Sequence, residues 1–406
     1  MRPAARRRAM TVTLPAALAA LAAAVCLAMA PLPMAAAVAK PSAGAQAVPA
    51  SAPVPDDQIG GPLMASQGIV VNYPDDSSPR VPDVPASSWV IANAGTGQVL
   101  AASDPHGKFG PASTMKVLTA ITLIPLLNPN AMVLATPLAA DTEANDAGLI
   151  AGHLYKVSDL FTALLTISAN DAAVALAQAT GSFARGMALI NAEARHLQAY
   201  DVVAEQPNGL PAPGQVESAY DEALIARQAL SMPAFMKYDS TLSAPFEVKP
   251  HDWETLVNQN WLLTKYPGAL GGKIGWTVSS EATYIGLARR NGVTLIVTLM
   301  HCTPLQEITS AIQLLNWGFA MNGKVAPVGQ LVPPLATATA AHRGLSKAEK
   351  ERQARLAASL AAAARGSSGQ PARYALLAGV VAVAGLGLGL ARRRRLAGRH
   401  RALTAA

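Results

Sequence analysis

Residues 374–391 place the tightest limit on how this chain can fold. They form a run of 18 residues without a charged side chain, mostly Ala, Val, Leu and Gly, and four arginines follow at once at 392–395. A helix of this length just crosses the hydrocarbon core of a bilayer, and an arginine cluster is typical of the cytoplasmic end of such a helix. A buried core helix is the alternative, but the run stands outside any domain. The sequence therefore predicts a transmembrane helix at 374–391 with a basic cytoplasmic tail at 392–406.

The N-terminal end has the pattern of an export signal. Four arginines precede an uncharged run from 9 to 39, which ends in the small-x-small cleavage pattern Ala37-Val38-Ala39. We expect residues 1–39 to be a signal peptide; an uncleaved anchor is the alternative, because the run is long enough to span a membrane. Together the two ends predict a single-pass protein at the extracytoplasmic face of the cell membrane.

The composition of residues 40–373 separates two linkers from one globular domain. Residues 40–82 are rich in Pro, Ala, Ser and Gly and have little periodicity, which predicts a disordered linker. After 322 the chain simplifies again, and a capping box at 346–349 opens an Ala-, Arg- and Glu-rich helix. Residues 323–373 are therefore predicted to be an Ala-rich linker with a helical stalk. One globular domain, 83–322, remains.

The formal charge of +7 does not describe this domain. Ten of the 32 basic residues lie at 1–39 and 392–406, which leaves 22 basic against 25 acidic side chains. Nucleic-acid binding needs basic residues clustered on the fold, so we expect no nucleic-acid partner. One of the two cysteines, Cys26, falls in the predicted signal, and the seven histidines show no ligand spacing. We therefore expect no metal and no cofactor.

The first motif with chemical content is Ser113-x-x-Lys116, which runs into the apolar stretch 117–127. A serine and a lysine three residues apart at the start of a helix lie on one face, about one turn apart. Serine is a poor nucleophile without a neighbouring base, and lysine becomes that base when burial or nearby positive charge lowers its pKa. An isolated Ser-x-x-Lys occurs by chance in many helices, so the motif gains weight only from other motifs.

Two such motifs follow. Ser168-Ala169-Asn170 comes at the end of a predicted helix at 159–167, and Lys273-Ile274-Gly275 precedes two predicted strands at 283–288 and 293–300. The serine and asparagine between two helices could simply cap a helix. In this order, however, the three motifs resemble the set shared by class A β-lactamases and penicillin-binding proteins.

Over residues 83–322 the chain resembles a serine-type D-Ala-D-Ala carboxypeptidase, a low-molecular-mass penicillin-binding protein of peptidase family S11, of actinobacterial type. The resemblance extends to 168–173, to Asn208-Gly209-Leu210 and Pro213-Gly214-Gln215, and to 218–221. It implies an α+β, β-lactamase/transpeptidase-like fold, in which an antiparallel sheet is flanked by helices and joined to a mainly helical second lobe. The β-rich C-terminal domain of many relatives is expected to be missing.

The resemblance also implies a role for each site residue. Ser113 would attack the penultimate carbonyl of a peptidoglycan stem peptide ending in D-Ala-D-Ala, with Lys116 as general base and Ser168 as proton shuttle. Asn170 would bind the peptide amide, and Lys273 would keep Lys116 neutral and attract the terminal carboxylate. The backbone N–H groups of Ser113 and Trp276 would form the oxyanion hole. β-Lactams would acylate the same serine as inhibitors.

The chain departs from the family pattern at Ile274, where relatives usually have a threonine whose hydroxyl helps bind the substrate carboxylate. Thr277 is a candidate for supplying that hydroxyl instead. We therefore expect an active but weak carboxypeptidase, and expect Ile274→Thr to raise its activity. One alternative is a β-lactamase, although no Glu-x-x-Leu-Asn element lies between Asn170 and Lys273. The other is a catalytically silent, membrane-tethered protein that binds muropeptides or β-lactams. The balance between carboxypeptidase, endopeptidase and transpeptidase action stays open.

Overall fold

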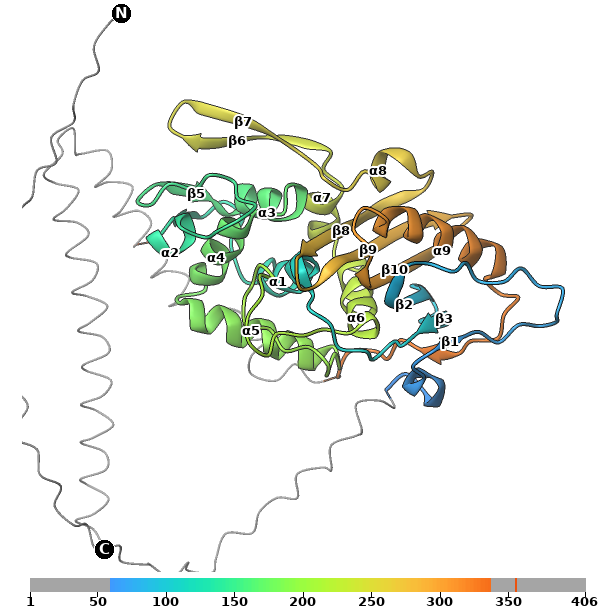
Figure 1. Ribbon diagram of the computed structural model, residues 1–406. Coiled ribbons are helices and arrows are strands. Elements are labelled where there is room, and N and C mark those ends of the chain that lie inside the picture. The colour runs from blue at the N-terminus through green and yellow to red at the C-terminus, as the bar shows by residue number, and fades with distance from the viewer. Residues whose placement is uncertain (1–58, 337–354, 356–406) are drawn as a thin grey trace, which may run out of the picture. The chain divides into compact units, whose positions relative to one another are not determined.

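The computed structural model describes residues 59–336 and Arg355. At its centre is a seven-stranded antiparallel sheet with the order β1-β3-β2-β10-β9-β8, in which β11 also pairs with β3 (Figure 1). The strands are β1 (Ile69–Val70), β2 (Ala86–Asn93), β3 (Gln98–Ser103), β8 (Ala269–Thr277), β9 (Glu281–Arg290), β10 (Val293–Cys302) and β11 (Gly329–Gln330).

The hairpin between β9 and β10 shows how local sequence fixes the register of the sheet. Arg290 pairs with Val293, and the two residues between them, Asn291 and Gly292, have φ angles of +47° and +80°. A two-residue loop with both φ angles positive matches the right-handed twist of the strands, and Asn-Gly is the sequence that adopts it most readily. Both strands are buried over most of their length, because helices cover both faces of the sheet.

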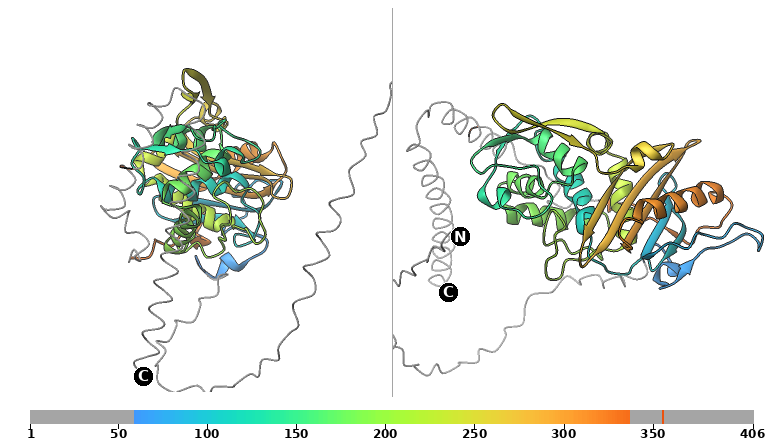
Figure 2. Two further views of the ribbon diagram at one scale, coloured as in Figure 1. Left: turned by 90° about the vertical axis from the view of Figure 1, so that its left-hand side faces the viewer. Right: turned by 45° about the horizontal axis from the view of Figure 1, so that its top comes forward.

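One face of the sheet is covered by α9 (Glu307–Met321), which lies along the strands in Figure 2. The contact is close: a Cβ built on Gly318 would lie 2.2 Å from Cδ1 of Ile91. The other face packs against α6 (Ala219–Leu230), and α1 (Met115–Leu123) packs against α6 in turn. All nine residues of α1 are buried, so this helix has no solvent face.

A mainly helical lobe adjoins the sheet, and Figure 1 shows α1 between the two. The lobe and its edges contain α2 (Pro137–Ala140), α3 (Val157–Thr166), α4 (Asn170–Ala179), α5 (Phe183–His196), α7 (Pro233–Asp239) and the hairpins β4 (Met132–Leu134)–β5 (Leu154–Lys156) and β6 (Ser243–Lys249)–β7 (Asp252–Val257), whereas the short α8 (Leu262–Lys265) packs beside β8. This arrangement confirms the predicted fold class.

The predicted linker boundaries were wrong on both sides of the domain. Residues 59–82, expected to be disordered, pack on the sheet: β1 pairs with β3, Met64 is fully buried, and the carbonyl of Pro79 accepts a hydrogen bond from Trp317. At the other end β11 also pairs with β3, and Leu331 is fully buried. A composition poor in periodicity does not prevent short segments from pairing with an exposed strand edge.

The predicted signal peptide at 1–39, the transmembrane helix at 374–391 and the tail at 392–406 lie outside the described residues, as does the helical stalk apart from Arg355. Among the helices that the structure does describe, none combines the length and the apolar character needed to cross a bilayer.

Candidate active site

Ser113 lies in a single 3-10 turn, η3 (Ala112–Thr114), which leads directly into α1. The turn is tied to the sheet through the carbonyl of Pro111, which accepts hydrogen bonds from the hydroxyls of Thr114 at 2.6 Å and of Thr283 on β9 at 2.7 Å. Ala112 has a φ of +48°, a left-handed conformation that costs about 1–2 kcal/mol for a residue with a Cβ atom. This tightly held turn places the half-buried Ser113 beside the sheet, at the first turn of α1.

Lys116 is fully buried, and its Nζ lies 2.7 Å from each of three oxygens: Ser113 Oγ, Asn170 Oδ1 and the carbonyl of Asn208. The amide of Asn170 is oriented by its Nδ2, which donates to the carbonyl of Glu143 at 3.0 Å. An amide oxygen and a carbonyl can only accept. The two N–H groups of a neutral amine are used by these two acceptors, and its lone pair then faces the hydroxyl of Ser113. A general base for this serine requires that arrangement.

The surroundings of Lys116 favour its neutral form. Burial lowers the pKa of Lys116 well below its ordinary value, and the positive charge of Lys273 lowers it further, against an opposing effect of Asp171. Lys273 is also buried, which lowers its own pKa to about 7, while Asp239 at the end of α7 acts in the opposite direction. Sequence reasoning anticipated the two lysines but missed Asp239, because no motif marks it.

Ser168 and Asn170 lie where α3 gives way to α4. The alternative that they cap a helix is wrong, because Ala169 is the N-cap of α4, Ser168 Oγ has no hydrogen-bond partner among the described residues, and Asn170 Oδ1 accepts from Lys116. The hydroxyl of Ser168 is buried and makes no hydrogen bond to any described residue, and its role as proton shuttle stays a prediction. Ser168 has a φ of +63°. The hydrogen bond from Asn170 N to the carbonyl of Asn145 holds the bend between α3 and α4 in place.

Strand β8 brings the third motif against the turn of Ser113. A Cβ built on Gly275 would lie 2.7 Å from the backbone nitrogen of Ser113, so only glycine allows this approach. Alternation along the strand places Lys273 on the same face as Gly275, and the Nζ of Lys273 donates to the carbonyl of Ile274 at 2.7 Å. The side chain of Ile274 lies on the opposite face and packs against the apolar cluster under α9.

The hydroxyl of Thr277 is engaged in closing the turn between β8 and β9. It donates to Ser280 Oγ at 2.8 Å and accepts from Ser280 N at 3.0 Å. Binding of a substrate carboxylate by Thr277 would require the first of these bonds to be exchanged, so that role stays a prediction. The side chain of Trp276 is 57% exposed, and the place of its backbone N–H in an oxyanion hole also stays a prediction.

A cluster of metal-ligating residue types, His106, Asp201 and Asp221, was not evident in the sequence. Nδ1 of His106 lies 2.7 Å from Asp201 Oδ2, and its Nε2 lies 3.0 Å from the carbonyl of Ile59. Lys108 lies 3.1 Å from the other oxygen of Asp201. The two ring nitrogens of His106 and the ammonium group of Lys108 thus already lie against neighbouring oxygens. The cluster is therefore a set of ion pairs rather than a set of metal ligands.

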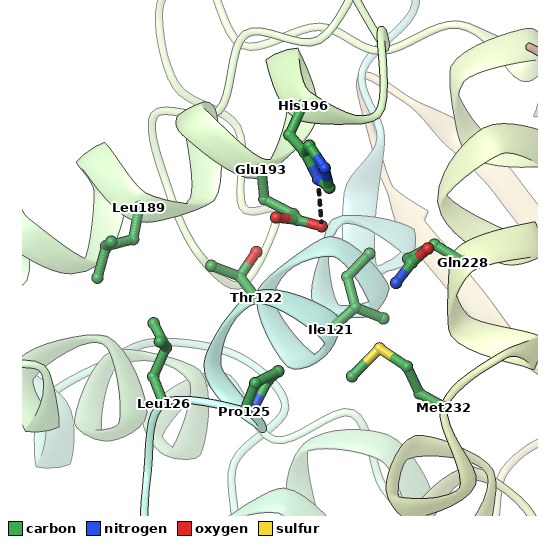
Figure 3. A pocket seen from close by; sticks show the side chains of 9 residues that line it. All are labelled: Ile121, Thr122, Pro125, Leu126, Leu189, Glu193, His196, Gln228 and Met232. Atoms are coloured by element: carbon green, nitrogen blue, oxygen red, sulfur yellow. Dashed lines mark hydrogen bonds and ion pairs between the residues drawn. The ribbon is translucent and has the colours of Figure 1, made fainter. Parts of the chain in front are cut away.

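A cavity of about 140 Å³ lies between α1, α5 and α6, lined among others by Ile121, Leu189 and Met232 (Figure 3). Its polar end holds Glu193 and His196, whose Oε1 and Nδ1 lie 3.5 Å apart. None of the site residues described above lines this cavity, so it is separate from the surface on which Ser113 acts.

A serine hydrogen-bonded to a buried lysine, held between an antiparallel sheet and a helical lobe, is characteristic of the serine enzymes of the transpeptidase/β-lactamase-like fold. Residues 75–303 match the family described as D-alanyl-D-alanine carboxypeptidase, peptidase S11. The chain belongs to this family.

Individual relatives agree with the assignment. The chain is 37% identical over 257 residues to D-alanyl-D-alanine carboxypeptidase DacB2 of Mycobacterium tuberculosis, a match covering 62% of this chain and 88% of the relative. It is 25% identical to DacF of Bacillus subtilis, over 58% of this chain and 62% of that protein. The crystal structure of the Streptomyces K15 DD-transpeptidase matches with a TM-score of 0.57 at 26% identity, covering 60% of this chain and all of that one.

Proposed function

We propose that this protein is a serine-type D-Ala-D-Ala carboxypeptidase that removes the terminal D-alanine from peptidoglycan stem pentapeptides through an acyl-enzyme. Ser113 Oγ attacks the carbonyl carbon of the penultimate D-alanine while its proton passes to Nζ of Lys116. The C–N bond then breaks, the leaving nitrogen takes a proton relayed through Ser168, and D-alanine departs. Water attacks the ester, releases the shortened peptide and returns the proton to Ser113.

The remaining site residues bind and orient the substrate in this proposal. Asn170 holds the peptide amide while it also orients Lys116, which ties substrate position to the base. Lys273, with Thr277, attracts the terminal carboxylate, and the N–H groups of Ser113 and Trp276 stabilise the oxyanion, at about 3–4 kcal/mol per donor in comparable enzymes. A β-lactam would react at the same serine by opening its ring amide.

The observation that carries the proposal is the hydrogen bonding of Lys116. Nζ of Lys116 lies 2.7 Å from Ser113 Oγ and from two acceptor-only oxygens, Asn170 Oδ1 and the carbonyl of Asn208, so that once the amine is neutral and donates to these two acceptors, its lone pair is available to the serine.

The test uses the full-length protein in detergent with a fluorescent penicillin and, separately, a peptide ending in D-Ala-D-Ala. We expect a covalent adduct on Ser113 by mass spectrometry and release of D-alanine from the peptide, and we expect Ser113→Ala to lose both. An adduct without D-alanine release would instead identify the silent binding protein. Rapid return of hydrolysed penicillin would identify a β-lactamase.

We also propose that the enzyme acts at the outer face of the cell membrane, exported by residues 1–39 and held by 374–391 with the tail 392–406 inside. The support is the apolar runs and their flanking arginines. Protease treatment of intact cells, followed by detection of epitopes placed before 374 and after 391, tests this topology. Protection of both epitopes would contradict it.

A further inference from the structure

Two buried glutamates lie behind the turn that carries the nucleophile, and the proposed mechanism does not use them. Glu222 is in the first turn of α6, and Glu217 precedes that helix; their side chains are 0% and 1% exposed. The backbone of Glu217 exchanges two hydrogen bonds of 2.9 Å with Phe109, in the segment that leads into the turn of Ser113. The backbone of Glu217 is therefore tied to the segment that supports the nucleophile.

The carboxyl of Glu222 faces the hydroxyl of Thr114, the residue next to Ser113. The one proton of that hydroxyl is committed to the carbonyl of Pro111, 2.6 Å away. Accordingly, neither oxygen of Glu222 accepts a hydrogen bond from a described residue. A carboxylate here would compete with Pro111 for the proton of Thr114, whereas a protonated carboxyl can donate to the hydroxyl oxygen and leave the bond to Pro111 intact.

The charges around Glu222 favour its protonated form. Burial, and then the charge of Glu217, raise the pKa of Glu222 well above its ordinary value against a smaller opposing effect of the Thr114 hydroxyl, and burial raises the pKa of Glu217 to about 8. Within the described residues, both oxygens of Glu222 and Oε2 of Glu217 are buried without a hydrogen-bond partner. The other titratable groups of this cluster are Asp221, which faces Glu217 and Asp201, and the ion-paired set Asp201, His106 and Lys108.

We propose that Glu222, protonated beside Glu217, is a positioning residue for Ser113: it donates to Thr114, and Thr114 in turn donates to Pro111, which fixes the turn. The proposal rests on the function proposed above. It makes the turn sensitive to alkaline pH, because ionisation of the pair withdraws the donor and turns the proton of Thr114 away from Pro111. Negative charge behind the turn would also favour the protonated, inactive form of Lys116.

The test compares Glu222→Gln, which keeps a neutral donor, with Glu222→Leu, which keeps only volume. The exposed Glu205→Gln is the matched control. Acylation of the full-length protein by a fluorescent penicillin is followed from about pH 6 to about pH 9, across the range in which the pair titrates. We expect acylation of the wild type to slow as pH rises. Glu222→Gln should keep the neutral-pH acylation rate within about threefold and lose that decline. Glu222→Leu should acylate about tenfold or more slowly at every pH, because it lacks one hydrogen bond to the turn.

Several outcomes would overturn the proposal. One is an alkaline decline that persists in Glu222→Gln, because the decline would then belong to Lys273. Another is equal rates for the Gln and Leu variants, which would reduce Glu222 to a packing role. Infrared spectroscopy provides a readout independent of activity: the carbonyl stretch of a protonated, buried carboxyl is expected at neutral pH in the wild type and should disappear in Glu222→Gln. Lack of acylation in the wild type would contradict the proposed function, while the infrared band would still decide whether Glu222 is protonated.

Discussion

Gly275→Ala separates two physical effects that act in opposite directions at the active site. In the middle of a strand, replacing glycine by alanine normally stabilises a protein by about 0.4–1 kcal/mol, because it reduces the freedom of the unfolded chain. Here the new Cβ would lie 2.7 Å from the backbone nitrogen of Ser113 and 2.2 Å from Oγ1 of Thr283. Ordinary contacts to a Cβ are 3.4–4 Å, so β8 and the turn must separate by about 0.7 Å or more.

The strand and the turn cannot separate freely. Gly275 is paired with Thr283 in the ladder between β8 and β9, and Thr283 also donates to the carbonyl of Pro111, which anchors the turn. Overpacking of this kind costs about 1–3 kcal/mol of stability. A displacement near 1 Å of a reacting group costs about 100-fold in rate. We therefore expect Gly275→Ala to lower the free energy of unfolding by about 1–3 kcal/mol and to slow acylation by a fluorescent penicillin by about 100-fold.

The measurements are thermal unfolding and the second-order rate constant of acylation, made on the same preparation of full-length protein. Gly68→Ala is the matched control, because a Cβ there meets nothing within 4 Å and its φ is not in the left-handed region. It should change neither quantity. A Gly275→Ala protein that is more stable than the wild type and acylates within about threefold of it would refute the reasoning, because strand propensity would then have outweighed the contact with Ser113.

Two further predictions concern the same strand. Lys273→Met removes the positive charge that lowers the pKa of Lys116. Since the base acts in its neutral form, the rise of the acylation rate with pH should move to higher pH in this variant. A rise that stays at the same pH would exclude this role for Lys273. Ile274→Thr puts the new hydroxyl on the face of β8 that packs under α9, so we expect it to lower the free energy of unfolding by about 1–2 kcal/mol through lost apolar packing, without the gain in D-alanine release that the motif alone suggested. Turnover and thermal unfolding measure the two effects, and a raised turnover would show that the hydroxyl reaches the substrate carboxylate.

The parts of the fold that could be predicted from sequence are those specified by local patterns. The Asn291-Gly292 turn sets the register between β9 and β10, and the apolar run after Ser113 becomes the buried helix α1. The short strands β1 and β11 could not be predicted in this way. Two residues have no detectable period, and both strands form only because β3 offers an unpaired edge that distant parts of the chain can reach.

The same distinction holds at the site. Contact between Ser113 and Lys116 follows from helical spacing, and the positive charge of Lys273 follows from its motif. The carbonyl of Asn208 could not be predicted as a partner of Lys116, because every residue has a carbonyl and only the folded chain decides which one points inward. The hydroxyl of Thr277 is the opposite case, because its residue type suited substrate binding. In the folded chain that hydroxyl instead donates a hydrogen bond to Ser280, which closes a turn.

Ile274 shows why a motif position can lose its usual residue while its neighbours keep theirs. Lys273 and Gly275 face the turn of Ser113, where one supplies charge and the other supplies space, so a substitution at either position changes the site directly. Residue 274 points to the other face of the strand, where it packs against the apolar cluster under α9. An isoleucine there gains burial at the cost of a hydroxyl that would point away from Ser113, so stability favours the residue that this chain carries. The substitution at 274 is thus compatible with the contact between Ser113 and Lys116, and its effect should fall on stability more than on acylation by penicillin.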